Sequence, residues 1–230
     1  NPAVGCVIVK NNEIVGMGYT SKNGRPHAEE NALTMAGKKA LGSTLYLTLE
    51  PCCLDNNNNS CTNQIINAGI RKVVIGMLDH NKLTFKKGIN TLKKNGLETK
   101  LLKLDFRNFL LNYSHYCFHS LNRPMISIKL ATSADSKISY ANGNSKWITS
   151  KLSRKHVHHI RSNYDAILVG TNTFVTDNPS LTVRIDGYEK PICRVLLDTN
   201  LILSNQSKLI KTINKNPLII FTNKSLSSVK

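Results

Sequence analysis

The feature that most constrains the fold is an alternation of apolar strand-like runs with helix-like segments from residue 4 onwards. Strands are predicted at 4–9, 14–19, 44–49, 71–76 and 98–102. Helices are predicted from His27, at 61–68, at 88–94 and, as one unbroken segment, at 106–121. The first helix follows Pro26, and its predicted buried stripe includes Leu33 and Met35. This alternation predicts an α/β domain in the first half of the chain.

The alternation stops at Asn122-Arg123-Pro124 and then starts again. Beyond that break, strands are predicted at 125–130, 165–170, 192–197 and 218–221, with a helix at 150–161. We therefore predict two α/β domains, residues 1–122 and 123–230. Because Asn1 opens a loop directly before a strand, and because the second domain is short, both ends of the sequence are expected to be truncated.

The chain of 230 residues is strongly basic, with 31 Lys and Arg, 14 Asp and Glu, and a net charge of +17. Such a charge can indicate an anionic partner. Here the lysines are spread along the chain, so a general Lys and Asn bias explains the charge as well as a binding face does. No apolar run approaches the ~18 residues of a membrane span, and the first residues do not resemble a signal peptide. Neither nucleic acid nor a membrane is the expected partner.

The six cysteines are unevenly spaced, and three of them fall within residues 52–61. A disulfide framework has a more regular arrangement and occurs in oxidising compartments. The crowding instead indicates a metal site in a reducing compartment, and we expect the protein to be cytoplasmic.

Three segments at the ends of predicted elements contain residue types that bind metals. His27 and Glu29 begin a helix, Cys52 follows a strand, and Cys61 begins the next helix. One His and two Cys leave the fourth position of a tetrahedral Zn²⁺ free for water, which is the arrangement of a catalytic site. Nearby helix N-termini are expected to lower the pKa of the thiols. Glu29 is the candidate general acid and base.

The same residues also allow plainer interpretations. A His before a helix is often a cap or a surface residue, and a Glu in a first turn often only interacts with the helix dipole. The combination with Pro51-Cys52 and Cys61 favours the zinc site. The zinc deaminase pattern joins H-x-E to P-C-x-x-C, and this chain has Asp55 where the second cysteine of that pattern stands. Cys61 is the candidate replacement, and Cys53 is predicted to be a structural thiol.

Segments in both halves of the chain resemble one known family. They are Asn1-Pro2-Ala3-Val4-Gly5, Pro26-His27-Ala28-Glu29, Thr44 to Cys52, Lys129-Leu130-Ala131, Lys146 to Ser150 and Asp177 to Arg184. In order and spacing they are similar to the bifunctional deaminase/reductase of riboflavin biosynthesis, a family with a long spacing between its zinc cysteines. The resemblance covers almost the whole chain. It implies an α/β fold with an N-terminal cytidine-deaminase-like three-layer domain and a partial dihydrofolate-reductase-like domain after it.

For the first domain, the resemblance implies zinc-dependent hydrolytic deamination. The implied substrate is a small phosphorylated pyrimidine, 2,5-diamino-6-ribosylamino-4(3H)-pyrimidinone 5′-phosphate, whose 2-amino group is replaced by oxygen. His27, Cys52 and Cys61 are the implied ligands of one Zn²⁺ per chain, which lowers the pKa of its water. Glu29 is the implied catalytic proton carrier, and Asn1 is an implied substrate contact.

For the second domain, the resemblance implies reduction of the ribosyl group to ribityl by NADPH. The implied cofactor contacts are Ala131, Trp147, Thr173, Asp177 and Thr199. The implied substrate contacts are Ser145, Arg161, Leu181 and Arg184. Arg161 and Arg184 suit a clamp for the substrate phosphate, although either could be a surface residue. Trp147 is predicted to face the cofactor rather than to fill a core. Because the family is usually oligomeric, a homo-oligomer is expected.

The chain departs from the family pattern between the zinc cysteines. There the family has a Ser-His pair and a Gly-Arg-Thr-Pro-Pro stretch that help to bind substrate, whereas this chain has asparagines at 56–59. Two alternatives therefore stay open. One is a degenerate member in which only the reductase is active. The other is a deaminase of another nucleobase or of RNA, which requires binding to RNA with a steep salt dependence.

Overall fold

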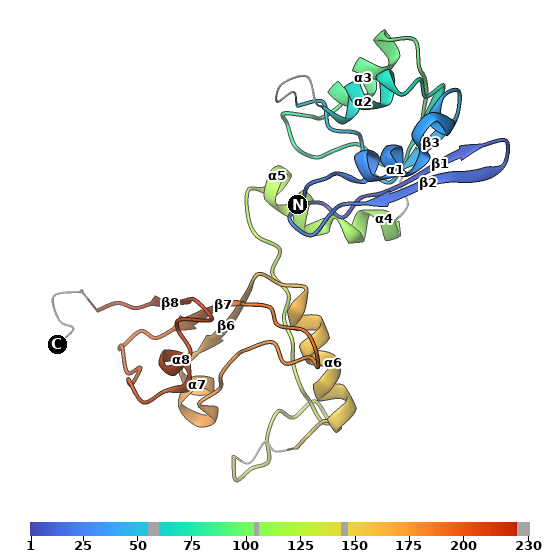
Figure 1. The fold of residues 1–230 in the computed structure, drawn as a ribbon. Coiled ribbons are helices and arrows are strands. Elements are labelled where there is room, and N and C mark those ends of the chain that lie inside the picture. Colours follow the sequence, from blue (N-terminus) through green and yellow to red (C-terminus); the bar gives the residue numbers. More distant parts are fainter. Residues whose placement is uncertain (55–59, 104–105, 144–146, 225–230) are drawn as a thin grey trace. The chain divides into compact units, whose positions relative to one another are not determined.

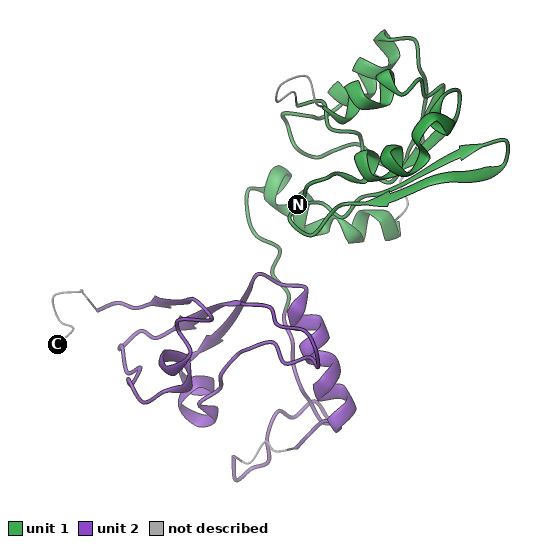
Figure 2. Ribbon diagram, viewed as in Figure 1, with its two compact units in different colours: residues 1–127 green, residues 128–230 purple. Residues whose placement is uncertain are grey.

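The computed structural model describes residues 1–54, 60–103, 106–143 and 147–224. The chain divides into two compact units, which Figure 2 colours separately: unit 1 is Asn1–Ser127 and unit 2 is Ile128–Lys230. This division lies a few residues beyond the break at Asn122-Arg123-Pro124 in the sequence pattern.

Unit 1 is built on a five-stranded sheet in the order β2-β1-β3-β4-β5 (Figure 1). The strands are β1 (Gly5–Lys10), β2 (Glu13–Tyr19), β3 (Thr44–Leu47), β4 (Lys72–Ile75) and β5 (Glu98–Leu101). β1 is antiparallel to β2 and β3, whereas β3, β4 and β5 are parallel to one another. All five strands lie where the sequence predicts them, with ends that differ by only one or two residues.

Three helices and the sheet share the core of unit 1. The helices are α1 (Ala28–Ala36), α2 (Cys61–Asn67) and α3 (Lys87–Lys94), and a short 3-10 helix, Gly37–Ala40, follows α1. Alternate residues of the strands, such as Ile8, Leu45 and Val73, are fully buried against them. The parallel strands require crossover connections, and α2 and α3 provide them.

Helix α1 packs unusually close to β2, and this closeness decides which residues it buries. A Cβ atom on Gly16 would lie 2.3 Å from the carbonyl oxygen of Ala32, so only glycine fits there. Ala32 and Ala36, the residues of α1 that meet Gly16, are accordingly small. The prediction that Met35 belongs to the buried stripe is wrong, because this side chain is 61% exposed and its sulfur accepts a hydrogen bond from the Met17 backbone N–H at 3.3 Å.

The predicted helix 106–121 is interrupted, so that prediction is also wrong in part. It forms two helices, α4 (Phe106–Leu111) and α5 (Tyr113–Leu121), separated by Asn112. The Asn112 side chain is 1% exposed; it accepts a hydrogen bond from the Ala3 N–H and donates one to the Ala3 carbonyl. This pairing satisfies both backbone groups of Ala3 and explains why the helix breaks at Asn112.

Unit 2 contains a three-stranded parallel sheet in the order β6-β7-β8 (Figure 1). Its strands are β6 (Ala166–Gly170), β7 (Cys193–Leu197) and β8 (Leu218–Phe221), and its helices are α6 (Lys151–Ser162), α7 (Thr171–Asp177) and α8 (Lys208–Lys211). Its core is small and includes Phe174, Leu181, Leu196 and Leu209. The sequence predicts α6 and the three strands but misses the short helices α7 and α8.

The predicted strand at 125–130 is not formed. Ile126, Ile128 and Leu130 are 75%, 85% and 70% exposed, and neither sheet contains this segment. A strand requires a neighbour to pair its backbone groups, and an apolar pattern cannot supply that neighbour. Among the described residues, no helix combines the length and apolar character that crossing a bilayer requires.

Candidate functional site

The candidate site lies at the carboxyl ends of the parallel strands β3 and β4, an edge where α/β sheets commonly bind ligands. The chain leaves β3 through Thr48 to Cys52 and enters α2 at Cys61, while His27 directly precedes α1. Ser60 caps α2 by accepting a hydrogen bond from the Asn63 N–H at 3.3 Å. The local folding signals therefore bring residues that are distant in sequence to one edge of the sheet.

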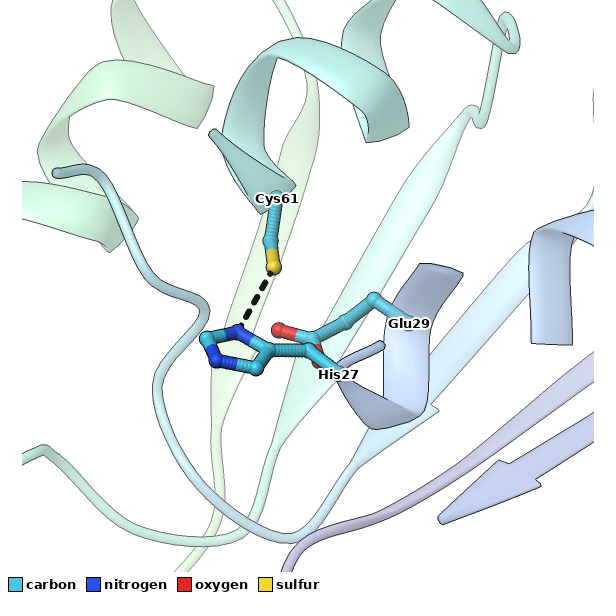
Figure 3. Close-up of side chains that lie close together, drawn as sticks. All are labelled: His27, Glu29 and Cys61. Atoms are coloured by element: carbon cyan, nitrogen blue, oxygen red, sulfur yellow. Dashed lines mark hydrogen bonds between the residues drawn. The ribbon is translucent and has the colours of Figure 1, made fainter. Parts of the chain in front are cut away.

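His27, Glu29 and Cys61 form a cluster at this edge, with one donor atom of each within 4.8 Å of the others. Nδ1 of His27 lies 3.2 Å from Sγ of Cys61. Figure 3 shows the Glu29 carboxylate turned towards the imidazole and the sulfur. Glu29 is 3% exposed and Cys61 is fully buried, so the cluster is enclosed on the side of the core.

Cys52, the third predicted ligand, lies outside that 4.8 Å group but is held beside it. Its backbone carbonyl accepts a hydrogen bond from the N–H of Thr62 at 3.2 Å, which ties the segment after β3 to the first turn of α2. Cys52 is half-buried. Burial raises the pKa of its thiol, and the charges of Glu29 and Asp79 act in the same direction.

Burial controls the electrostatics of the cluster. It raises the pKa of the Cys61 thiol, and the neighbouring Glu29 carboxylate raises it further. Burial and the Glu29 charge therefore oppose the lowering of this thiol pKa that is expected from the start of a helix. Burial also raises the pKa of Glu29 to about 7, although a hydrogen bond from Cys61 partly opposes this. A carboxyl group with such a pKa can both accept and donate a proton near neutral pH.

The donor set fits a zinc ion. Nitrogen and sulfur are the donors that Zn²⁺ prefers, and two ligands of a tetrahedral zinc lie roughly 3–4 Å apart. The separation of His27 and Cys61 falls in that range. The thiols of Cys61, which is buried, and Cys52, which is half-buried, both have raised pKa values and need a nearby cation to become thiolates. The zinc site expected from the sequence is thus chemically consistent with the residues that meet here.

Glu50 organises the loop that follows β4, and the sequence analysis missed it. This carboxylate is 4% exposed and accepts hydrogen bonds from the backbone N–H groups of Asp79, Lys86 and Ile89. The loop after β4 is therefore fastened to the residue that directly precedes Pro51. The position of Glu50 next to the Pro51-Cys52 motif was the one available signal.

Asp79 is a second residue that the sequence analysis missed. Its carboxylate lies 2.8 Å from Nε2 of His115 on α5 and accepts a hydrogen bond from the Thr84 hydroxyl at 2.6 Å. Burial acts to raise its pKa, but these two bonds, a hydrogen bond from the Asn81 N–H and the charge of His115 together outweigh burial, and the net pKa is lowered. Asp79 follows β4 at the ligand-binding edge of the sheet, which is a usable signal, whereas nothing in the sequence marks His115.

Asn1, the predicted substrate contact of unit 1, lies beside Gly24 in the loop before α1. A Cβ atom on Gly24 would lie 2.3 Å from the Asn1 amide nitrogen, and Gly24 has a φ of +87° that favours glycine. Residues 56–59, which replace the family's substrate-binding stretch, lie outside the described residues.

Unit 2 has a separate, cationic pocket of about 600 Å³. Its basic lining residues include Lys129, Lys151, Arg154, Lys155, Arg161 and Arg184. Trp147 forms part of the wall and is 70% exposed, so the interpretation of this residue as a core filler is wrong. The Arg154 guanidinium lies 4.1 Å from the centre of the Trp147 ring.

Three predicted contact residues, Trp147, Arg161 and Arg184, therefore meet at this pocket. Five others lie elsewhere in unit 2, outside the pocket lining: Ala131, Thr173, Asp177, Leu181 and Thr199. Thr173 and Asp177 are exposed on α7, and Thr199 is exposed after β7. Leu181 is 7% exposed and belongs to the core. Ser145 lies outside the described residues.

Comparison with known families agrees with this division into two sites. Residues 1–77 match the cytidine and deoxycytidylate deaminase zinc-binding region. Residues 124–230 match the RibD C-terminal domain. The fold class that the sequence resemblance implies, a cytidine-deaminase-like domain followed by a reductase-type domain, is confirmed by these matches.

Relatives of known name match nearly the whole chain. The riboflavin biosynthesis protein RibD of Aquifex aeolicus (strain VF5) is 43% identical over 224 residues, which cover 97% of this chain and 63% of the relative. The protein of the same name from Escherichia coli (strain K12) is 41% identical over 184 residues, or 80% of this chain and 50% of the relative. The chain thus spans less than two thirds of the length of these relatives.

Solved structures extend the similarity to the backbone. The diaminohydroxyphosphoribosylaminopyrimidine deaminase/5-amino-6-(5-phosphoribosylamino)uracil reductase of Thermotoga maritima has a TM-score of 0.89 and 36% identity, covering 98% of this chain and 64% of that one. Acinetobacter baumannii RibD, form 1, has a TM-score of 0.89 and 32% identity, covering 99% of this chain and 65% of that one.

The two domain matches and the buried His-Glu-Cys cluster define a class: a zinc-deaminase-type domain joined to a reductase-type domain. Within that class, the relatives and structures that match both halves are RibD proteins. The chain belongs to the RibD family of riboflavin biosynthesis proteins.

Proposed function

We propose that the full-length protein is a bifunctional enzyme of riboflavin biosynthesis. Unit 1 deaminates 2,5-diamino-6-ribosylamino-4(3H)-pyrimidinone 5′-phosphate, and unit 2 belongs to the domain that reduces the ribosyl group of the product to ribityl, giving 5-amino-6-ribitylaminouracil 5′-phosphate. The observation that carries this proposal is the buried cluster of His27, Glu29 and Cys61 in a chain whose other half matches the RibD C-terminal domain.

In the deamination, His27, Cys52 and Cys61 would hold one Zn²⁺, and a bound Zn²⁺ would lower the pKa of a water molecule so that hydroxide is available at the ring carbon that carries the 2-amino group. Glu29 takes the proton of the attacking water. It passes this proton to the ring nitrogen, then takes the remaining proton from the hydroxyl group now bonded to the ring carbon and delivers it to the leaving amine. The amine departs as ammonia and the ring carbon keeps a carbonyl oxygen. Its enclosed position beside the two ligands and its pKa of about 7 suit this proton transfer. Asn1 contacts the substrate from the loop before β1.

In the reduction, bound NADPH would be the source of the hydride that the ribosyl carbon accepts. The basic pocket of unit 2 holds the substrate phosphate, with Arg161 and Arg184 as the clamp and Trp147 as the wall towards the cofactor. The remaining contacts proposed by family resemblance are Ala131, Thr173, Asp177 and Thr199 for the cofactor and Ser145 and Leu181 for the substrate. Binding of a small phosphorylated substrate in this basic pocket also explains part of the net charge of +17.

Zinc content and ammonia release test the first reaction in the full-length protein. We expect about one zinc per chain, and we expect Cys61→Ser to abolish both zinc binding and ammonia release from the diaminopyrimidinone phosphate. Cys53→Ser is the matched control, since this neighbouring thiol is not a proposed ligand, and it should retain both. Zinc loss in Cys53→Ser, with zinc retained in Cys61→Ser, would contradict the ligand assignment.

The proposal also includes the cellular location and the oligomeric state of the protein. The thiol ligands require a reducing compartment, which supports a cytoplasmic location, and all six cysteines lie unpaired in the structure. Family resemblance supports a homo-oligomer. Analytical ultracentrifugation of the full-length protein tests the second property, and a single monomeric species at micromolar concentration would contradict it.

A further inference from the structure

His158 on α6 faces one of the two arginines that are proposed to bind the substrate phosphate. Nδ1 of His158 accepts a hydrogen bond from the backbone N–H of Arg184 at 3.2 Å. Nε2 of the same ring lies 3.2 Å from Nη2 of the Arg184 guanidinium. Both ring nitrogens are therefore directed at Arg184, one at its backbone and one at its side chain.

Other contacts show that α6 holds the whole segment that carries Arg184. Arg161, on the same helix, donates a hydrogen bond from Nη1 to the carbonyl of Thr182 at 2.6 Å. Within the segment, Nη1 of Arg184 donates to the Ser180 hydroxyl at 3.0 Å. Leu181 has a φ of +53°, a conformation that a non-glycine residue keeps only when its surroundings hold it there. The guanidinium of Arg184 is thus oriented by a defined set of bonds.

The hydrogen-bond inventory of imidazole makes this arrangement depend on an uncharged ring. In the neutral tautomer in which Nδ1 accepts from the Arg184 backbone N–H, Nε2 carries the ring proton, so the backbone bond uses the one acceptor of this ring. The doubly protonated ring has no acceptor left. It would then present N–H groups to the N–H groups of Arg184 on both sides.

The charges around the ring favour that neutral form. Burial lowers the pKa of His158, and Arg184 and Arg161 lower it further, while a hydrogen bond to the backbone of Thr182 acts in the opposite direction without reversing the shift. The other charged or titratable groups that line the pocket or flank His158 are Lys129, Lys151, Arg154, Lys155, His159 and Asp186. Asp186, the one acid in the lining, pairs with Lys155 at 3.4 Å rather than with His158. The ring is therefore surrounded mainly by positive charge.

We propose that His158 is a positioning residue for the reductase reaction, which as a neutral acceptor holds the backbone of Arg184 so that its guanidinium is placed for the phosphate of the substrate. The proposal rests on the proposed function, in which Arg184 binds that phosphate. His158 itself does not touch the reacting atoms. Loss of His158 should therefore weaken the preference of the reductase for the phosphorylated substrate over the dephosphorylated one. It should not slow hydride transfer equally for both substrates.

The test compares two substrates of the reductase reaction in the full-length protein: the phosphorylated substrate and its dephosphorylated analogue. The readout is the ratio of their kcat/KM values, which isolates the contribution of the phosphate. His158→Ala is expected to lower this ratio roughly 5- to 15-fold, the value of about one hydrogen bond. His158→Asn, which keeps an acceptor and a donor on a short side chain, should recover most of the ratio. His156→Ala, on the same helix and exposed, is the matched control and should leave the ratio unchanged.

A double-mutant comparison separates this inference from the proposed function. Adding His158→Ala to Arg184→Ala should produce no further fall in the ratio, because the two residues act through one contact. If Arg184→Ala lowers the ratio while His158→Ala leaves it unchanged, the positioning role is wrong and the phosphate site stands. If Arg184→Ala itself leaves the ratio unchanged, the phosphate site is wrong and the inference fails with it. An equal loss on both substrates in His158→Ala and His158→Asn would show a purely structural role and overturn the proposal.

Discussion

The candidate sites of the two units differ in how far their residues are buried. In unit 1 the candidate zinc cluster is sunk into the sheet edge, with Glu29 and Cys61 removed from water by the core beneath them. In unit 2 the candidate phosphate pocket is an open, basic depression along α6, whose cations remain in contact with solvent. Enclosure shifts pKa values and favours proton transfer, whereas an exposed basic pocket attracts and binds an anion without burying unpaired charge.

The cores beneath the two sites differ in the same way. In unit 1, the strands and helices α1 to α3 bury one continuous apolar cluster. In unit 2, the sheet buries a much smaller cluster, and Leu168, Ile219 and Phe221 on its strands are 57%, 48% and 60% exposed. A rigid core holds metal ligands to within fractions of an ångström, which a zinc site needs more than a phosphate pocket does. Four predictions test this contrast.

The largest effect is expected for Glu29→Gln in the full-length protein. Deamination should fall about 10²- to 10⁴-fold because the proton carrier is lost, while zinc stays bound because the three proposed ligands are intact. NADPH oxidation by the reductase should be unchanged. Metal analysis, ammonia release and NADPH absorbance measure the three properties. Loss of zinc in this variant would mean that Glu29 helps to hold the metal.

Truncation of one buried side chain in each core compares the units directly. Ile65 and Leu209 are both fully buried, in unit 1 and unit 2 respectively. Ile65→Ala and Leu209→Ala should each reduce the free energy of unfolding of their own unit by about 2–5 kcal/mol. Calorimetry of the two variants should then show different transitions displaced. A single common transition that shifts equally in both variants would show that the units unfold together.

Arg184→Ala should raise the KM for the phosphorylated reductase substrate about 10- to 100-fold, the value of a charge-assisted hydrogen bond in this pocket. The KM for NADPH should change less. Steady-state kinetics with each substrate varied in turn measure both constants. Lys208→Ala, on α8 and outside the pocket lining, is the control. A larger rise in the cofactor KM would reassign Arg184 to the cofactor.

The smallest effect is expected for Asp79→Asn, and it depends on pH. Because the folded-state pKa of Asp79 is lowered, its ionised form stabilises the protein above the unfolded pKa of about 4, and this contribution is lost as the pH falls through the folded value. The variant should be about 1–3 kcal/mol less stable than the parent at pH 7, with a narrowing difference below pH 4. Urea unfolding at several pH values measures it.

Asp186→Asn is the control for that experiment, since this side chain is 98% exposed and should show no such pH dependence. A stability difference between Asp79→Asn and the parent that stays constant from pH 7 to pH 3 would mean that the contacts with His115 and Thr84 do not favour the ionised form.

Some predictions from the sequence were confirmed because they depend on local patterns. The five strands of unit 1 and the start of α2 at Cys61 follow from apolar runs, turn residues and a capping serine, all of which act over a few residues. The meeting of His27, Glu29 and Cys61 could also be predicted from the sequence. Each residue lies at the beginning of a helix, and the ends of such elements meet at one edge of the sheet.

Other features depended on contacts between residues far apart in the chain. The break at Asn112 arises from its bonds to Ala3, and Met35 is exposed because Gly16 lets α1 approach β2 too closely for a large inward side chain. The apolar segment 125–130 stays unpaired because no neighbouring strand lies beside it among the described residues. Local patterns contain no information about such partners.

The sequence by itself therefore determined the order of most elements, the family, and the meeting of His27, Glu29 and Cys61. Only the tertiary structure decided the pKa values of the site residues and the contacts that position them. These include the burial that raises the pKa of Glu29, the hydrogen bonds of Glu50 to the loop after β4, and the contact of His158 with Arg184. The physical reason is that desolvation and hydrogen bonding depend on what surrounds a group in three dimensions. A residue's neighbours along the chain make up only a small part of those surroundings.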